Sequence, residues 1–471
     1  MINADNANEK LFKEMMIGKK VAVLGLGVSN LPALDFLDEC GAVITACDKT
    51  PADKFDEDVL RKIQKLSDEY YLGEDYLDHL EGQDIILKSP GIKPSLPQIA
   101  EAKKSGTVIT SEMEIFMSLC PCRIIGVTGS DGKTTTTTII YKMLSEEGYN
   151  CYVGGNIGTP LLGKLDEIKK DDIVVLELSS FQLMNMSVSP EVAVVTNISP
   201  NHLDYHRDMS EYVEAKSQIF SHQDSDGRLI VNMDNAITAA FAKNRKAKTE
   251  FFSRRQKPDG AYVDDGYLCY NGEKIVAVED IKIPGWHNVE NYLAAIAAVR
   301  PYVSAKTIRK VARTFCGVEH RMELVRTVDG IEFYNDSIGS SPTRTIAGLV
   351  AHKGKIVLIA GGYDKNLNYD ELGVAVRNHV SALVLIGATS SKIETSVKKA
   401  FGAKKCPIPI VHEKNYEMAV RAAFVLARSL KKGDERVSVI LSPASASFDM
   451  FKNFMERGDL FKKIVGKLKI D

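Results

Sequence analysis

A glycine-rich turn followed by Lys-Thr near residue 130 is the strongest candidate for chemistry in the chain. Residues 124–141 read IIGVTGSDGKTTTTTIIY, an apolar run typical of a buried strand, then the turn, then a threonine-rich helix. Backbone N–H groups in such a turn can bind phosphate oxygens, with Lys133 reaching the outer phosphates and the Thr134 hydroxyl binding magnesium. Val127 stands where a standard P-loop has its first glycine, so the loop is a variant. The alternative is an ordinary strand-to-helix connection with chance glycines.

Polar side chains follow several apolar runs downstream of this turn. Glu177 ends the run DIVVLE, His202 lies beyond VAVVT, and Asn156 lies in GGNIG. If these runs are strands of one parallel sheet, their ends present polar groups at a single edge. A carboxylate and an imidazole at that edge can both reach a cation bound to nucleotide phosphates. Taken singly, each is more commonly a cap or a solvated side chain.

Two further helices carry side chains whose roles the sequence leaves open. The first, SEYVEAKSQIF, has Ser210 as its expected cap and Lys216 on one face, where it is interpreted as a surface lysine. The second begins in GWHNVEN, where Asn288 and Asn291 can contact a base or a ribose. Capping of the helix is an equally good interpretation of these two amides.

The first hundred residues have a strand–helix–strand pattern. The run KVAVL leads into GLGVSN, a helix follows, and VITACD is a second strand. Asn30 stands where a dinucleotide fingerprint needs its third glycine, so the two preceding glycines are a weak signal. Asp48, at the end of the second strand, can contact a ribose or a base edge. A structural α/β unit without a ligand is the alternative.

The last third of the chain again alternates apolar runs with helical stretches. KIVLIA, ALVLIG and RVSVIL predict three strands, and Arg321 and Asp336 fall in loops before them. We therefore predict an α/β protein of three domains: a Rossmann-like domain at 1–111, a central P-loop ATPase-type domain with a parallel sheet at 112–316, and a second Rossmann-like domain at 317–471.

Composition limits the class of protein. The 471 residues are 44% hydrophobic and 26% charged, which is typical of a soluble globular protein. A net charge of −2 gives no reason to expect a nucleic-acid or membrane partner, and we expect a monomer. Eight cysteines without a regular framework, in a chain without an apolar signal segment, predict a reducing cytoplasm. The close pair Cys120-Pro-Cys122 lacks the second ligand pair that a zinc site needs.

The order of these motifs resembles the Mur ligase family of peptidoglycan synthesis, and within it the D-glutamate-adding members. TGSDGKTTT, GGNIG, ELSSFQL, NHLDYH, GWHNVEN, HRME, NDS, GGYDK and LSPASASFDMFKNFMERG follow the family's order over almost the whole chain. The resemblance implies an ATP-dependent ligase that joins D-glutamate to UDP-N-acetylmuramoyl-L-alanine through an acyl phosphate and a tetrahedral intermediate. It also implies two magnesium ions.

The resemblance further implies roles for individual residues. The ATP site would comprise Gly129, Ser130, Asp131, Gly132, Lys133, Thr134, Thr135, Asn288, Arg321 and Asp336. The UDP-sugar substrate would contact Val28, Ser29, Asp48, Lys49, Ser89, Asn156, Ser179, Gln182 and His202. D-Glutamate would contact Ser340, Lys365, Ser447, Phe448 and Phe454. The catalytic group would be Lys133, Glu177, His202 and Lys216. The metal ligands would be Thr134, Glu177, His202 and Lys216, the last carbamylated by carbon dioxide.

Two departures from the family pattern and two rival functions stay open. Ile338 stands where many members carry a lysine, with Arg344 as a candidate substitute, and Asn201 stands where some members have an acidic residue. One rival is another amino-acid-adding Mur ligase or a ligase similar to folylpolyglutamate synthetase. The other, from a different class, is a nicotinamide-dependent oxidoreductase or a nucleotide sensor built on GLGVSN.

Overall fold

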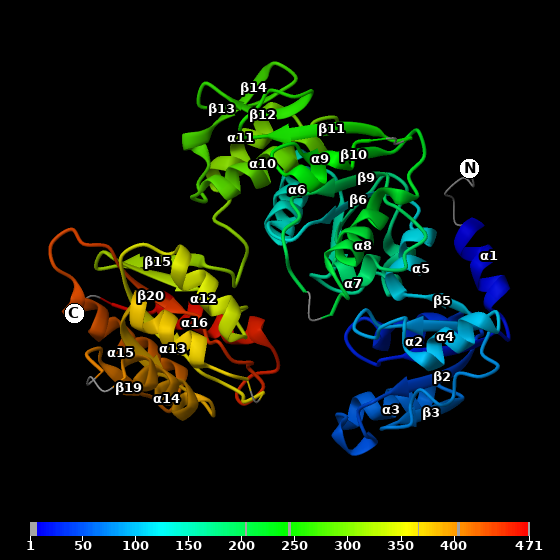
Figure 1. Ribbon diagram of the computed structural model, residues 1–471, viewed down its shortest axis with the longest axis horizontal. Coiled ribbons are helices and arrows are strands. Elements are labelled where there is room, and N and C mark those ends of the chain that lie inside the picture. The colour runs from blue at the N-terminus through cyan, green and yellow to red at the C-terminus, as the bar shows by residue number, and fades with distance from the viewer. Residues whose placement is uncertain (1–6, 203–204, 244–245, 366, 403–405, 470–471) are drawn as a thin grey trace. The chain divides into compact units, whose positions relative to one another are not determined.

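The computed structural model describes residues 7–202, 205–243, 246–365, 367–402 and 406–469 (Figure 1). The chain divides into two compact units, Met1–Phe315 and Cys316–Asp471. The first unit contains two β-sheets and the second contains one. All three sheets are mainly parallel and are covered by helices, which confirms the predicted α/β class.

The first sheet is fully parallel. Its strands are β1 (Lys20–Leu24), β2 (Val43–Asp48), β3 (Glu69–Leu72), β4 (Ile85–Lys88) and β5 (Val108–Thr110), in the spatial order β3-β2-β1-β4-β5. Its helical segments are α1 (Ala7–Met16), α2 (Asn30–Glu39), η1 (Ala52–Lys54), α3 (Glu57–Leu66), α4 (Pro97–Lys104) and α5 (Glu112–Leu119). Alternate residues of β1 face opposite ways, so Val21 and Val23 pack with α2 while Ala22 and Leu24 pack with α4. This double burial explains the continuous apolar run of the central strand.

The second sheet has nine strands in the order β14-β13-β12-β11-β10-β9-β6-β8-β7. The strands are β6 (Arg123–Thr128), β7 (Cys151–Gly155), β8 (Ile173–Glu177), β9 (Val192–Val195), β10 (Arg228–Asn232), β11 (Lys248–Ser253), β12 (Gly260–Asp264), β13 (Tyr267–Tyr270) and β14 (Glu273–Ala277). Strands β6 to β12 are parallel to one another, and β13 and β14 continue the sheet antiparallel. The carboxyl ends of β6, β8 and β9 therefore meet at one edge, which is where open parallel sheets place ligands.

The helices of this second sheet brace the predicted phosphate loop. They are α6 (Lys133–Glu147), η2 (Leu162–Glu167), α7 (Ser180–Leu183), α8 (Met209–Ser221), α9 (Ala236–Ala240), η3 (Val278–Asp280), α10 (Trp286–Val299) and α11 (Ala305–Thr314). Helix α10 packs against α6, and its residues 291–299 are all buried. The predicted cap at Ser210 is wrong, because α8 begins earlier and the Asp208 carboxylate accepts the Glu211 N–H at 2.9 Å.

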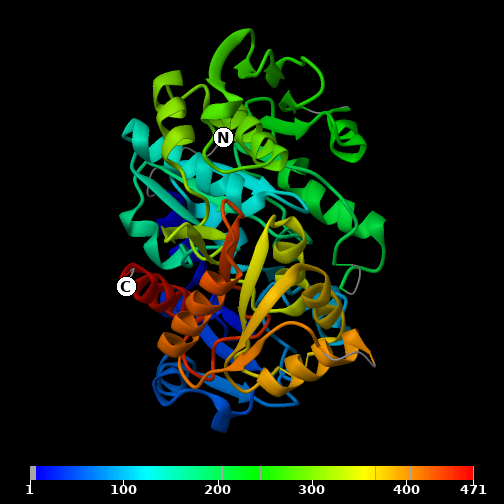
Figure 2. The same ribbon diagram turned by 90° about the vertical axis from the view of Figure 1, so that its left-hand side faces the viewer.

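The third sheet forms the second unit. Its strands are β15 (Glu323–Val328), β16 (Ile331–Asn335), β17 (Lys355–Ala360), β18 (Val380–Leu385), β19 (Ile410–His412) and β20 (Val437–Leu441), in the order β15-β16-β20-β17-β18-β19 with only β15 antiparallel among these described strands. Its helices are α12 (Pro342–Ala351), α13 (Asp370–His379), α14 (Ser390–Phe401), α15 (Tyr416–Leu430) and α16 (Phe454–Gly466). Helices α15 and α16 share a core with one face of the sheet, and α12, α13 and α14 with the other (Figure 2). None of the helices in the described ranges has the length and apolarity needed to span a bilayer.

Candidate functional site

The turn between β6 and α6 has a backbone that only glycine can adopt at two positions. Gly129 has φ 149° and Gly132 has φ 77°, both in the region that L side chains avoid. A Cβ on Gly129 would lie 1.9 Å from Thr196 Oγ1, and one on Gly132 would lie 2.2 Å from Asn291 Oδ1. The two glycines thus flank a tight turn that is pressed between the end of β9 and helix α10, as the loop sequence predicts.

The exit of β9 holds the middle of the turn in place. Asn197 accepts the Ser130 N–H through its backbone carbonyl at 2.8 Å and the Asp131 N–H through its side chain at 3.0 Å. The Ser130 hydroxyl lies 2.9 Å from the hydroxyl of Tyr212 on α8. The backbone N–H groups of Ser130 and Asp131 are therefore already hydrogen-bonded within the protein. The N–H groups of the first turn of α6 have no carbonyl partner within the helix, so they are the better candidates for donating to a phosphate.

Two lysines converge on one carbonyl of this turn. Lys133 Nζ donates to the Gly129 oxygen at 2.9 Å and to the Ser130 oxygen at 2.8 Å. Lys216 Nζ, from α8, donates to the same Gly129 oxygen at 2.8 Å and to Thr128 Oγ1 at 3.3 Å. The structure thus brings Lys216 to the end of β6, where it meets Thr128, 88 positions away in the sequence.

The expectation that Lys216 is a surface lysine is wrong. Its side chain is 1% exposed and its ammonium lies 4.9 Å from the centre of the Tyr212 ring. Burial lowers the pKa of Lys216 well below its ordinary value, and the nearby charge of Lys133 lowers it further, while Glu177 acts in the opposite direction. The buried amine is consequently far easier to deprotonate than a lysine in water.

Glu177, at the end of β8, supplies a buried carboxylate with one unused oxygen. The residue is 1% exposed, and its Oε1 accepts the Asn156 side-chain N–H at 2.7 Å. Its Oε2 is buried and has no hydrogen-bond partner among the described residues. Such an atom is costly unless something binds it, and a hard cation such as magnesium prefers carboxylate oxygen. No cluster of three or more His, Cys, Asp or Glu side chains suited to a metal occurs in the described ranges, so other ligands would have to complete the coordination.

Two histidines lie beyond β9, and sequence reasoning singled out only the first. His202 is exposed, has φ 55°, and meets the Phe181 ring edge-on at 5.0 Å between ring centres. His206 is buried, stacks on the Phe181 ring at 5.7 Å between ring centres, and its Nε2 lies 2.9 Å from Ser180 Oγ. Burial lowers the pKa of His206. The second histidine of NHLDYH was the available signal for this residue.

Other predicted substrate contacts bond to one another or to the backbone. Ser179 and Gln182 form a capping box at the start of α7, with Ser179 Oγ 2.9 Å from Gln182 Oε1. At the start of α10, Asn288 donates to the Pro284 carbonyl at 2.7 Å, and Asn291 is buried against the glycine turn. The N-cap position of α10 is Gly285, so neither amide occupies it.

At the edge of the first sheet, Asp48 and Asn30 fasten the glycine turn after β1. Both oxygens of the Asp48 carboxylate accept backbone N–H groups, from Leu26 at 2.6 Å and Thr50 at 2.8 Å. Asn30 is buried and donates to the Leu24 carbonyl at 3.0 Å. The asparagine in place of a third glycine therefore has a structural role in this turn.

The other residues predicted for the UDP group surround the same edge. Val28 is 81% exposed and Lys49 is also exposed, while Ser29 immediately precedes α2 and makes no side-chain capping bond. Ser89 follows β4, and a Cβ on Gly25 would lie 2.5 Å from its Oγ, so the two turns are in close contact. These side chains are available at the carboxyl ends of β1, β2 and β4.

In the second unit, Asp336 is buried and Arg321 is exposed. Its two carboxylate oxygens accept the Ser442 hydroxyl at 2.6 Å and the Met322 N–H at 3.2 Å. Burial raises the pKa of the Asp336 carboxyl to about 6, and the two hydrogen bonds oppose that rise. The neutral carboxyl is thus the form that this environment favours.

We expect Asp336→Asn to remove a pH dependence of stability. Folding raises the pKa of the Asp336 carboxyl from 3.8 to about 6. The protonated carboxyl therefore contributes its full stabilisation below pH 3.8, and this contribution is lost as the pH rises through 6. Relative to the variant, the wild type should lose about 2 kcal/mol of unfolding free energy between pH 4 and pH 7. Urea unfolding of the full chain at each pH measures this, with exposed Asp434→Asn as the matched control. A difference that does not change with pH would contradict the prediction.

Sequence reasoning also missed Arg457, whose side chain joins two loops of the second unit, the one between β16 and α12 and the one after β20. The side chain is fully buried. It donates to the Ser337 carbonyl at 2.8 Å, to Ser445 O at 3.0 Å and to Ser340 Oγ at 3.3 Å. A buried guanidinium is costly unless it keeps such partners, so these bonds are expected to persist. Arg457 therefore holds in place Ser340, one of the residues predicted to bind D-glutamate. The arginine of FMERG, in the last long motif, was its only signal.

The other residues predicted to bind D-glutamate lie on neighbouring loops of the second unit. The Lys365 ammonium lies 5.1 Å from the centre of the exposed Phe448 ring, and Ser447 beside it is buried. Phe454 begins α16 and meets the His320 ring edge-on at 6.0 Å. The structure thus brings Lys365 together with Phe448.

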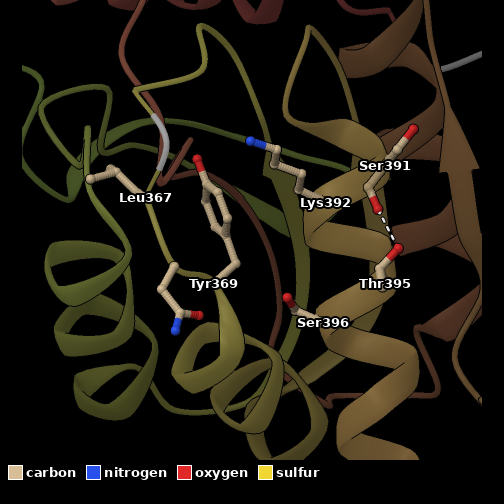
Figure 3. A pocket seen from close by; sticks show the side chains of 7 residues that line it. Leu367, Tyr369, Ser391, Lys392, Thr395 and Ser396 are labelled. Atoms are coloured by element: carbon tan, nitrogen blue, oxygen red, sulfur yellow. Dashed lines mark hydrogen bonds between the residues drawn. The ribbon is translucent and has the colours of Figure 1, made fainter.

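The second unit also contains a pocket of about 410 Å³ (Figure 3). Its lining comes from the segment before α13 and from α14, and comprises Leu367, Asn368, Tyr369, Ser391, Lys392, Thr395 and Ser396. None of the residues predicted to bind D-glutamate lines this pocket. Lys392, the charged residue of the lining, forms an ion pair with Asp364. The pocket therefore gives no reason to extend the candidate site.

Comparison with protein families gives three matches that together cover most of the chain. Residues 19–111 match the Mur ligase MurD-like N-terminal domain, residues 127–299 the Mur ligase middle domain, and residues 320–440 the Mur ligase glutamate ligase domain. A UDP-N-acetylmuramoylalanine–D-glutamate ligase of Acetivibrio thermocellus is 53% identical, with 98% of this chain and 100% of the relative covered. A protein of the same name from Ruminiclostridium cellulolyticum is 48% identical with the same coverage.

Solved structures of more distant proteins share the fold. MurF from Acinetobacter baumannii aligns with a TM-score of 0.56 at 17% identity, covering 94% of this chain and 93% of that one. UDP-N-acetylmuramate-alanine ligase from Thermotoga maritima aligns with a TM-score of 0.54 at 16% identity, covering 96% and 100%. At these identities the likeness concerns the fold alone.

Proposed function

The chain belongs to the Mur ligase family, and from this premise we propose that it joins D-glutamate to UDP-N-acetylmuramoyl-L-alanine at the expense of ATP. The observation that carries the proposal is identity of about half over the full length with relatives named for this activity. The lysine-bearing glycine turn at the carboxyl edge of a parallel sheet supports the use of ATP. We also propose domains at 1–111, 112–316 and 317–471, a monomer, and a cytoplasmic location, where ATP and reduced thiols are available.

The proposed reaction overcomes the poor reactivity of a carboxylate toward an amine. The alanyl carboxylate attacks the γ-phosphate, giving an acyl phosphate and ADP, and the amine of D-glutamate then attacks the carbonyl carbon and expels phosphate. Two anions must approach each other in the first step, so the Lys133 ammonium and the first amides of α6 would offset the charge that accumulates there. Arg321 and Asp336 would contact the nucleotide phosphate and ribose.

We propose that Thr134, Glu177, His202 and carbamylated Lys216 hold two magnesium ions. Bound magnesium would supply Lewis-acid stabilisation of the phosphate oxygens. The unused Oε2 of Glu177 supports this assignment. The burial of Lys216 supports the carbamate, because only an uncharged amine adds carbon dioxide, and the product is the oxygen donor that a hard cation prefers.

The remaining site assignments rest on the family resemblance. We propose that UDP-N-acetylmuramoyl-L-alanine contacts the carboxyl edge of the first sheet around Asp48 and Ser89, and reaches Asn156, Ser179 and Gln182 with its alanyl end. We propose that D-glutamate binds Ser340, Lys365, Ser447, Phe448 and Phe454. A lysine ammonium and hydroxyl groups are suited to a dicarboxylate, which supports the second assignment.

Phosphate release from ATP with each substrate omitted in turn tests the function. We expect release only when UDP-N-acetylmuramoyl-L-alanine and D-glutamate are both present. Replacing D-glutamate by L-glutamate, L-lysine or diaminopimelate distinguishes this activity from that of other Mur ligases and of folylpolyglutamate synthetase. Turnover that needs neither amino acid nor UDP-sugar, or that prefers another amino acid, would overturn the proposal.

A further inference from the structure

The proposed ligase activity uses none of the cysteines, yet two of them are in contact. Cys120 and Cys122 flank a proline in the connection between α5 and β6, and their sulfur atoms lie 3.6 Å apart. Both are thiols that no disulfide joins, and their sulfur atoms contact each other directly. Both side chains are half-buried, so neither is sealed from small reagents.

The two thiols are chemically unequal. Hydrogen bonding from the Cys122 thiol lowers the pKa of Cys120, and the same interaction together with burial raises the pKa of Cys122. Thiolate is the nucleophilic form of cysteine, so Cys120 is the member that reacts first with an electrophile. Cys122, held at van der Waals distance, is the member placed to react second.

The connection that contains Cys120 and Cys122 is short and joins helix α5 directly to strand β6. Helix α5 shares a core cluster with the first sheet through Phe116, and the chain passes directly through the pair into β6, whose other end is the glycine turn. A sulfur–sulfur bond needs a separation of about 2 Å, so closing it requires a movement of about 1.5 Å within this connection. A bond here would fix the backbone between the first and second sheets.

We propose that Cys120 and Cys122 form a reversible dithiol–disulfide site that reacts with hydroperoxides. The Cys120 thiolate attacks the terminal peroxide oxygen, the O–O bond breaks, and the protonated leaving oxygen departs as water or alcohol. The resulting Cys120 sulfenic acid is attacked by Cys122 sulfur, which forms the S–S bond and releases water. The two thiols together lose two electrons and two protons, and the peroxide is reduced. A dithiol reductant reverses the reaction by exchange.

Peptide mapping of the intact wild-type chain tests the site without any variant. The segment between Lys104 and Arg123, which trypsin releases, contains both cysteines and no others. After reaction with limiting hydrogen peroxide and alkylation of free thiols, we expect this peptide to have lost two hydrogens and to resist alkylation until dithiothreitol is added. Cys316 is exposed and serves as the internal control. We expect the pair to react at least about tenfold faster than Cys316, since thiolate character determines the rate.

Two variants separate the roles of the thiols. In Cys122→Ser, Cys120 should accumulate as a sulfenic acid that dimedone traps, and in Cys120→Ser the peptide should react no faster than Cys316. Oxidation of Cys316 before the pair, or absence of the peptide that has lost two hydrogens, would overturn the proposal. Because this mapping needs no turnover, its outcome is independent of whether the ligase activity is assigned correctly.

Discussion

Lys133→Ala is expected to reduce phosphate release by roughly a thousandfold while the protein remains folded. The ammonium of Lys133 lies at the turn where the proposed phosphates bind, and removing one preorganised group that stabilises developing charge typically costs a factor of 10² to 10³. Folding should tolerate the change, because the Gly129 carbonyl that loses Lys133 still accepts from Lys216. Coupled phosphate-release kinetics with all three substrates measure the effect.

The matched control for this variant lies on the same helix. Lys142 is exposed and nine residues further along α6, so Lys142→Ala removes the same charge and the same methylene groups away from the turn. Its activity should stay within about twofold of wild type, as expected for a surface substitution. Equal losses in the two variants, or retention of a tenth of the activity by Lys133→Ala, would remove Lys133 from the proposed phosphate site.

Lys216→Met is expected to abolish activity without lowering stability. The change removes the amine proposed to carry the carbamate, so we expect a loss of about a thousandfold or more. Methionine has a similar length and is apolar, and burying a charged group is costly. No buried partner loses its last hydrogen bond, because Gly129 O still accepts from Lys133 and the Thr128 hydroxyl still donates to Leu178 O. The melting temperature should therefore be unchanged or raised.

A spectroscopic measurement distinguishes the carbamate from a merely structural lysine. Wild type incubated with ¹³C-bicarbonate should show a carbamate resonance by NMR, and Lys216→Met should lack it. Ser217→Ala, one residue away on α8, is the matched control and should retain both the resonance and the activity, because its hydroxyl bonds only within the helix, to Glu214 O. An active Lys216→Met protein would contradict the role proposed for this side chain.

Local sequence patterns predicted the elements of the site well. The loop between β6 and α6 could be predicted because the glycines, the apolar run before them and the helix after them are contiguous. By contrast, β3 and α3 escaped the sequence analysis. The strand β3 is a four-residue edge strand whose side chains are exposed or half-buried, so it has no apolar run. Edge strands of this kind carry little periodic signal.

Orientation and long-range pairing were beyond local patterns. A helical spacing places Lys216 on a face of α8 but does not tell whether that face looks toward solvent or toward the sheet. The order β9-β6-β8 decides that Glu177 lies beside the turn, and no residue of the turn specifies that order. Likewise, the burial of His206 rather than His202 depends on how the chain turns after β9. The family resemblance supplied the role of Lys216, which spacing alone did not.

The burial of α10 against α6 has a consequence for how such an enzyme can change over evolutionary time. The proposed phosphate-binding turn packs on a helix pair that tolerates few substitutions, because residues 291–299 are all buried and Asn291 fills the space beside Gly132. The side chains proposed to bind the amino acid lie instead on loops of the third sheet, whose core clusters are separate from that of the second sheet. Mutations that alter the choice of amino acid can therefore accumulate there without repacking the helices beside the proposed nucleotide site. This separation is consistent with the retention of one fold at 16–17% identity.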